Sequence, residues 1–146
     1  MVAHYLPELL ATEPYDVWEL SAFLDEHGAA PGRRNEGRRL AYHDSCHMLR
    51  ELGVADAPRR LLEQSGAELV PLPRPDLCCG FGGTFSIRQP ELSVAMADEK
   101  LGGARGADAL VTADPGCLVH LSTRSERTGG PRVLHLATVL ACGAGE

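Results

Sequence analysis

The sequence predicts an α/β fold in which a three-layer, open parallel sheet of about four strands is flanked by helices. Strand-like segments alternate along the chain with helix-like segments, a pattern typical of right-handed βαβ crossovers around a parallel sheet. The composition, 44% apolar but only 5% aromatic over 146 residues, suits one ordinary domain with a small aliphatic core. We therefore expect a single globular domain overall.

Four segments of the chain are expected to be strands, and helices should lie between and after them. The expected strands are residues 39–43, 68–72, 109–113 and 132–134. The expected helices are residues 46–52, 56–65, 90–101, 115–121 and 136–141. Prolines in the first turns and glycines just beyond the last turns support the second and third of these helices.

A lead-in helical segment, residues 1–28, is predicted to precede the main domain at residues 39–146. Asp16 is expected to be the N-cap of its helix, with a glutamate three residues later as a box-like partner. Gly28 is placed to end that helix. The polar loop 29–39, rich in glycine and arginine, would connect the two parts.

Four cysteines are expected to meet at one edge of the sheet. Cys46, the adjacent pair Cys78 and Cys79, and Cys117 follow the carboxyl ends of three different predicted strands. In an open parallel sheet these ends share one edge, where ligands bind. Cys46 and Cys117 also lie near predicted helix N-termini, where the dipole favours a thiolate over a thiol. The sequence thus predicts a site built from four thiolates.

Soft thiolate ligands select zinc or iron–sulfur clusters. Four cysteines suit either a tetrahedral zinc site or a cluster with one thiolate per iron. Paired Cys-x-x-Cys motifs of a zinc ribbon are absent, and adjacent cysteines reach two different irons more comfortably than one ion. An iron–sulfur cluster, of the 4Fe-4S type, is the leading prediction. A structural zinc site, a dithiol oxidoreductase using Cys78 and Cys79, and unligated buried cysteines are the alternatives.

Several residues beside the cysteines are expected to surround the centre. They are His43, Asp44, His47, Gly80, Gly82, Gly83 and His120. The histidines would orient or polarise the centre, and the glycines would let the backbone approach its sulfurs, which accept N–H groups. Asp44 has a second interpretation as a helix N-cap, and His120 either adds a ligand or faces a helix groove. Cys142 is expected to play no part, and no residue is assigned a catalytic role.

Charge and hydropathy argue against several functional classes. The formal net charge of −6 argues against a nucleic-acid surface, which is normally basic. No run approaches the roughly 18 apolar residues of a membrane span, and no signal-peptide pattern opens the sequence. We expect a cytoplasmic protein, because thiols stay reduced there. Residues 80–85 do not form a dinucleotide-binding loop, because Phe85 stands where the third glycine is needed.

Three segments carry a resemblance to a known family: residues 42–47 (YHDSCH), 78–86 (CCGFGGTFS) and 114–118 (DPGCL). Between the cysteines, 31 residues separate Cys46 from Cys78, and 37 separate Cys79 from Cys117. With these motifs the chain resembles the cysteine-rich CCG domain family over nearly its whole length. The likeness is greatest to the branch of lactate-utilisation protein A and the glycolate oxidase iron–sulfur subunit. The corresponding cysteine-rich subunit of heterodisulfide reductase is a more distant relative.

The resemblance implies an iron–sulfur electron-transfer subunit, or a fragment of one, in a complex oxidising L-lactate or a related 2-hydroxy acid. Its ligands would be Cys46, Cys78, Cys79 and Cys117, and partner subunits would bind the hydroxy acid. The chain departs from the family pattern at His120, which replaces the last cysteine of a Cys-x-x-Cys motif. Family members carry two such repeats, and this chain resembles the second. A homo-oligomer is therefore expected to cover the apolar surface that a missing repeat would expose.

Overall fold

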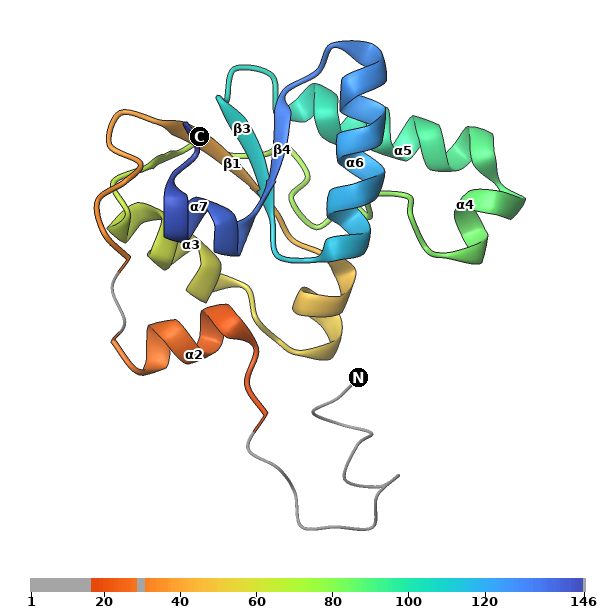
Figure 1. The fold of residues 1–146 in the computed structure, drawn as a ribbon. Coiled ribbons are helices and arrows are strands. Elements are labelled where there is room, and N and C mark those ends of the chain that lie inside the picture. Colours follow the sequence, from red (N-terminus) through yellow and green to blue (C-terminus); the bar gives the residue numbers. More distant parts are fainter. Residues whose placement is uncertain (1–16, 29–30, 146) are drawn as a thin grey trace, which may run out of the picture.

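The computed structural model describes residues 17–28 and 31–145, and the expected α/β fold is confirmed (Figure 1). The strands are β1 (Arg39–His43), β2 (Glu68–Leu69), β3 (Ala109–Thr112) and β4 (Arg132–His135). They form one sheet in the order β2-β1-β3-β4, and every neighbouring pair is parallel. Because all four strands run in the same direction, their carboxyl ends lie at one edge.

Helices cover both faces of the sheet and complete the three layers. They are α2 (Leu20–Glu26), the π-helix η1 (His47–Glu51), α3 (Asp56–Gln64), α4 (Thr84–Arg88), α5 (Pro90–Gly103), α6 (Pro115–Thr128) and α7 (Leu136–Cys142). On one face lie α3 and α7, with α2 packed against α3, and on the other lie α5 and α6 (Figure 1). No helix in the described part of the chain is long and apolar enough to cross a membrane.

The central strand β1 divides its side chains between the two helical layers, because successive residues of an extended chain point to opposite faces. Leu40 and Tyr42 join the core beneath α3 and α7, and Ala41 joins the core beneath α5 and α6. His43, two residues after Ala41, is placed by the same alternation on the α5–α6 side. This placement matters because the cysteine site lies on that side.

The lead-in helix starts later than expected. It begins at Leu20, and its N-cap is Glu19, whose carboxylate accepts the backbone N–H groups of Ser21 and Ala22. A side chain that takes two of the free N–H groups of the first turn is a sufficient cap. Asp16, the expected N-cap, lies outside the described residues.

Two further boundaries differ from expectation, and one short helix was not expected. The second strand, β2, ends at Leu69 rather than three residues later, although Val70 still donates its backbone N–H to the Leu40 carbonyl at 2.8 Å. The helix predicted to end near Leu121 runs on to Thr128 and ends at Gly129, which has φ 65°, the left-handed conformation common after helices. The short helix α4, directly after the glycine-rich turn, was not expected.

The loop before β1 is anchored to the domain by one buried side chain. The amide of Asn35 is fully buried and donates to the Ser65 hydroxyl at 2.9 Å and to the Val139 carbonyl at 3.1 Å. Its oxygen accepts the backbone N–H of Ala144 at 2.8 Å. These bonds join the loop to the end of α3 and to α7, so the loop is part of the packed domain.

Candidate metal centre

The carboxyl edge of the sheet brings together cysteines that are far apart in the sequence. Cys46 follows β1, Cys78 and Cys79 lie in the loop after β2, and Cys117 lies in the first turn of α6, after β3. The Sγ atoms of Cys79 and Cys117 are 3.1 Å apart. Both residues are buried, with exposed fractions of 3% and 5%. The predicted meeting of distant cysteines is thus confirmed for this pair.

Cys117 is positioned by the turn that opens α6. The Asp114 carboxylate is the N-cap and accepts the backbone N–H of Cys117 at 2.9 Å, while Pro115 occupies the first turn. A Cβ added to Gly116 would lie 2.9 Å from the ring of Phe81. A side chain at this position would therefore displace the ring of Phe81, which packs directly on this turn.

The turn after the adjacent cysteines is shaped by its contact with α5. Gly80 has φ 92°, and a Cβ on it would lie 2.5 Å from the Ser93 carbonyl oxygen. The Ser93 hydroxyl donates to the Gly80 carbonyl at 2.7 Å. We expected this glycine to make room for a sulfur-rich centre, but it makes room for a helix. The expected N–H contacts to sulfur are present, from Gly80 to Cys78 at 3.4 Å and from Phe81 to Cys79 at 3.5 Å.

The other two glycines of this turn have different surroundings. A Cβ on Gly82 would lie 2.9 Å from the Cβ of Phe85, which lies in the first turn of α4. Gly83, at φ 55°, has no neighbour within 4 Å of such a Cβ among the described residues. Both therefore serve the tight connection into α4, through its left-handed backbone.

Cys46 and Cys78 lie at the rim of the site. Cys46 is exposed and Cys78 is partly buried, in contrast to the buried Cys79 and Cys117. Burial raises the pKa of the Cys46 thiol, and the nearby charges of Cys78 and Cys79 raise it further. Cys46 is thus close enough to Cys78 and Cys79 for their charges to raise the pKa of its thiol. Neither Cys46 nor Cys78 belongs to the group of donor atoms that lie within 4.8 Å of one another, which in the described part of the chain consists of His43, Cys79 and Cys117.

The thiols differ sharply in acidity. The pKa of Cys79 is lowered to about 4, mainly by the hydrogen bond with Cys117 and also by His43 and the Phe81 N–H, against the opposing effect of burial. The same hydrogen bond, with burial and the Cys79 charge, raises the pKa of Cys117 far above its usual range. We expected the helix dipole to favour thiolates at Cys46 and Cys117. Without a cation, burial and neighbouring thiolates outweigh the dipole at both.

His43 joins the two buried cysteines. One ring nitrogen of His43 and the sulfurs of Cys79 and Cys117 all lie within 4.8 Å of one another, and all three residues are buried. The sequence placed His43 only in the surroundings of the centre. The signal that could have found it is the strand alternation, which sends His43 to the same side as Ala41.

Asp44 is a structural anchor and not the expected N-cap. Its carboxylate is 5% exposed and accepts two hydrogen bonds from the Arg59 guanidinium, at 2.8 and 2.7 Å. This guanidinium also lies over the Tyr42 ring, 5.2 Å from its centroid. The cap role belongs to Ser45, whose hydroxyl accepts the backbone N–H of Met48 at 3.2 Å.

The other two histidines of the expected surroundings have partners outside the cysteine cluster. His47 lies at the surface with its Nδ1 2.8 Å from a Glu51 carboxylate oxygen. His120 lies between α5 and α6, with its Nε2 3.3 Å from the Ser93 hydroxyl and its ring 6.0 Å from that of Phe81. The position of His120 agrees with the helix-groove interpretation.

The profile of the family described as "CCG: Cysteine-rich domain" matches residues 40–122, more than half of the chain. This chain belongs to the cysteine-rich CCG domain family. The match begins within β1 and ends within α6, so it spans all four cysteines of the site.

The CCG domain is similar to bacterial proteins named lactate utilization protein A. The protein from Geobacillus kaustophilus (strain HTA426) is 55% identical over 106 residues, which cover 70% of this chain and 44% of the relative. The protein from Geobacillus thermodenitrificans (strain NG80-2) is 46% identical over 134 residues, covering 84% and 54%. That from Lysinibacillus sphaericus (strain C3-41) is 47% identical over 115 residues, covering 76% and 50%. The chain spans about half the length of these curated relatives.

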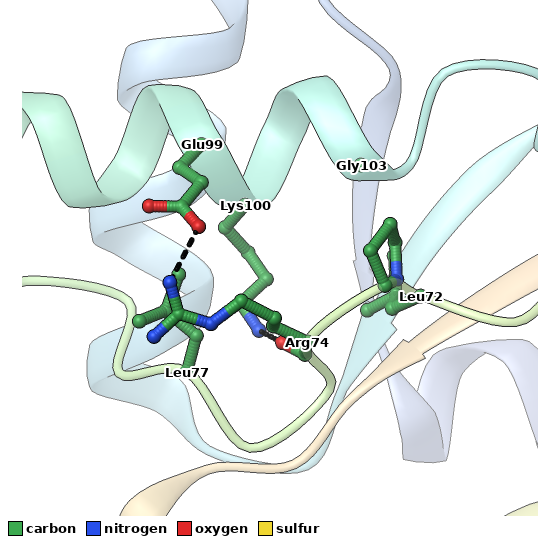
Figure 2. A pocket seen from close by; sticks show the side chains of 7 residues that line it. Leu72, Arg74, Leu77, Glu99, Lys100 and Gly103 are labelled. Atoms are coloured by element: carbon green, nitrogen blue, oxygen red, sulfur yellow. Dashed lines mark hydrogen bonds and ion pairs between the residues drawn. The ribbon is translucent and has the colours of Figure 1, made fainter.

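The loop that leads to the adjacent cysteines of the CCG domain is bound by Lys100, whose side chain extends from α5 toward it (Figure 2). Lys100 is 3% exposed, and its Nζ donates to the carbonyls of Arg74 and Pro75, at 2.5 and 3.0 Å. Arg74 in turn bonds Glu99 at 2.9 Å, beside a cavity of about 170 Å³ that Leu72 helps to line. Burial lowers the pKa of Lys100 to about 8.

The donor set suits a soft metal centre. Two thiolates at one tetrahedral ion, with bonds of about 2.3 Å, hold their sulfurs about 3.8 Å apart. Cys79 and Cys117, at 3.1 Å, need to separate by only about 0.7 Å to reach that spacing. His43 adds a nitrogen donor, and Cys46 and Cys78 add thiolates at the rim. A cation would also reverse the electrostatics, because it stabilises every adjacent thiolate.

Proposed function

We propose that this chain is an iron–sulfur electron-transfer subunit, or part of one, in a complex that oxidises L-lactate or a related 2-hydroxy acid. The observation that carries the proposal is the contact of Cys79 with Cys117 at the sheet edge that Cys46 and Cys78 also border. Thiolate-rich sites of this kind suit iron–sulfur clusters. The name of the relatives, lactate utilization protein A, supports lactate as the substrate class.

In this proposal two of the four cysteines bind the cluster from the protein core and two bind it from the surface. Cys79 and Cys117 hold the buried side of a 4Fe-4S cluster, and Cys46 and Cys78 hold the side that faces solvent. The cluster supplies one-electron redox chemistry when bound. A redox partner could come close to the cluster at this exposed rim. The backbone N–H groups that bond the Cys78 and Cys79 sulfurs would tune the reduction potential of the cluster.

The hydroxy acid itself is assigned to partner subunits, so the CCG domain passes electrons and has no substrate site of its own. We place it in the cytoplasm, because its five cysteines are all free thiols and such thiols persist in reducing compartments. Self-association is part of the proposal and is tested by light scattering after size exclusion. A monomer at all concentrations would refute self-association and leave the electron-transfer function unaffected.

Metal and sulfide analysis of protein purified without oxygen tests the cluster directly. We expect iron and acid-labile sulfide in equal amounts, with visible absorbance that dithionite bleaches. Cys79→Ser should abolish the absorbance, because it removes a buried ligand. Cys142→Ser is the matched control and should leave it unchanged, because this exposed cysteine ends α7 on the opposite helical layer. Equal effects of the two substitutions would refute the ligand assignment.

Two other functions give different results in the same experiment. A zinc-stabilised scaffold domain would yield colourless protein with zinc bound in place of iron. A dithiol oxidoreductase would yield a metal-free protein that cycles between thiols and a disulfide. The 3.1 Å contact favours Cys79 with Cys117 for that role, because closure to a bond of about 2.05 Å needs a small shift.

A further inference from the structure

His43 is a buried imidazole whose two nitrogens have no hydrogen-bond partner in the part of the chain that the structure describes. Its side chain has no exposed surface, and neither Nδ1 nor Nε2 has a hydrogen-bond partner among the described residues. Leaving a buried polar group unpaired is unfavourable, and such groups are uncommon in folded proteins. A neutral imidazole carries one hydrogen-bond donor and one acceptor, and both groups of His43 are unpaired among the described residues. The groups that face this imidazole in the described part of the chain are the sulfurs of Cys79 and Cys117, each within 4.8 Å of a ring nitrogen.

A second histidine in the same row of the sheet shows that the fold can satisfy an imidazole at a strand end. His43 is in register with Thr112 of β3, which is in register with His135 of β4. The Nδ1 of His135 accepts the backbone N–H of Ala137 at 3.1 Å, and its Nε2 lies 3.1 Å from the Ala113 carbonyl oxygen. His135 is thus fully bonded, whereas His43 is not. The difference between them is that His43 faces sulfur.

The direction of His43 is set by the strand and not by a flexible loop. It is the last residue of β1, with its backbone in the central pairing of the sheet. A ring nitrogen lies within 4.8 Å of the Sγ atoms of both Cys79 and Cys117. Three donor atoms from three elements therefore face one small buried volume.

We propose that His43 is a direct nitrogen ligand of the metal held by Cys79 and Cys117. The inference rests on the proposed metal centre, and it changes the donor set of that centre. A cluster iron takes one protein ligand, so His43 would replace one of the two rim thiolates, Cys46 or Cys78, neither of which belongs to the close donor group of His43, Cys79 and Cys117. Iron and zinc both accept neutral imidazole beside thiolates. Exchange of thiolate for imidazole raises the potential of a cluster, so His43 would make the centre easier to reduce than one with thiolates alone.

Nitrogen coordination is measured on the metal-loaded protein by two methods. Pulsed electron paramagnetic resonance of the reduced cluster, with isotopically labelled histidine, detects a nitrogen bonded to iron. X-ray absorption detects an imidazole on zinc or iron. We expect one coordinated imidazole in the wild-type protein. This measurement needs no substitution, so it holds even if changes at a buried position impair folding.

Substitutions identify which histidine is bound. His43→Cys keeps a ligand at the position, so we expect it to retain metal, lose the nitrogen signal and shift the midpoint potential downward. His47→Asn and His120→Asn are the matched controls, and both should keep the signal, because their rings have partners outside the cluster. A nitrogen signal that survives in His43→Cys, or is lost in His120→Asn, would overturn the assignment.

The outcomes separate this inference from the proposed function. Iron and sulfide with no bound nitrogen would keep the function and refute the ligand, leaving His43 as an N–H donor to the Cys79 sulfur. Zinc with a bound nitrogen would keep the ligand and refute the redox function. A protein that takes up neither iron nor zinc after anaerobic reconstitution would refute both.

Discussion

Replacement of Gly80 by alanine is expected to destabilise the CCG domain strongly. At φ 92° the added methyl group would lie 2.5 Å from the Ser93 carbonyl oxygen and 3.2 Å from the Cβ of Met96. The left-handed backbone costs a non-glycine residue about 1–2 kcal/mol. Reaching ordinary contact requires the turn and α5 to separate by about 0.9 Å, and overpacking of this kind typically costs about 1–3 kcal/mol. The sum is about 2–5 kcal/mol.

Two other glycines separate these contributions. Gly83→Ala also places a methyl group on a backbone of positive φ, 55° with ψ −108°, but the group meets no atom within 4 Å among the described residues, so it should cost only the backbone strain of about 1–3 kcal/mol. Gly102→Ala lies in α5, also with open space around the new methyl group, and should stabilise by about 0.5–1 kcal/mol because alanine favours helix. The difference between Gly80→Ala and Gly83→Ala measures the contact with Ser93.

Urea unfolding of the reduced protein, followed by circular dichroism, gives the three free energies. We expect the order Gly102→Ala, wild type, Gly83→Ala and Gly80→Ala, from most to least stable. Iron content should fall in the same order, because the turn carries Cys78 and Cys79. Equal unfolding free energies for Gly80→Ala and Gly83→Ala would show that the close approach of α5 is not what requires glycine at this position.

Two further predictions concern charged groups. Burial holds the pKa of Lys100 near 8 in the folded protein, below its ordinary value of 10.5. Between these two pH values the unfolded chain binds more protons than the folded protein does. The free energy of unfolding therefore rises with pH over this range, by at most about 3 kcal/mol. Lys100→Met should abolish this rise in urea titrations from neutral pH to about pH 10, and an unchanged rise would exclude Lys100 as its source. Asp44→Asn should cost about 2–3 kcal/mol, because it uncouples a buried carboxylate from Arg59. The same change at Asp98, whose pair with Arg124 is more exposed, should cost under about 1 kcal/mol; similar losses in thermal melts would contradict the burial argument.

Much of this architecture is readable in local patterns. The alternation of strand and helix segments predicts a parallel sheet, and a parallel sheet places every strand end at one edge. The positions of Cys46, Cys79 and Cys117 after predicted strands therefore indicate a shared site before any coordinates exist. The Asp114 cap and the proline that follows it predict the start of α6 for the same local reason.

The sequence by itself thus determines the fold class, the sheet edge and the four thiols of the CCG domain, because these depend on periodicity and on neighbours along the chain. Tertiary structure alone decides that Cys79 contacts Cys117 and that Gly80 lies against α5. It also decides that Asp44 binds Arg59 and that His43 faces the cysteine sulfurs with no hydrogen-bond partner among the described residues. Each of these is a contact between elements, set by ångström-scale packing of side chains from distant segments. Local patterns carry no measure of such distances.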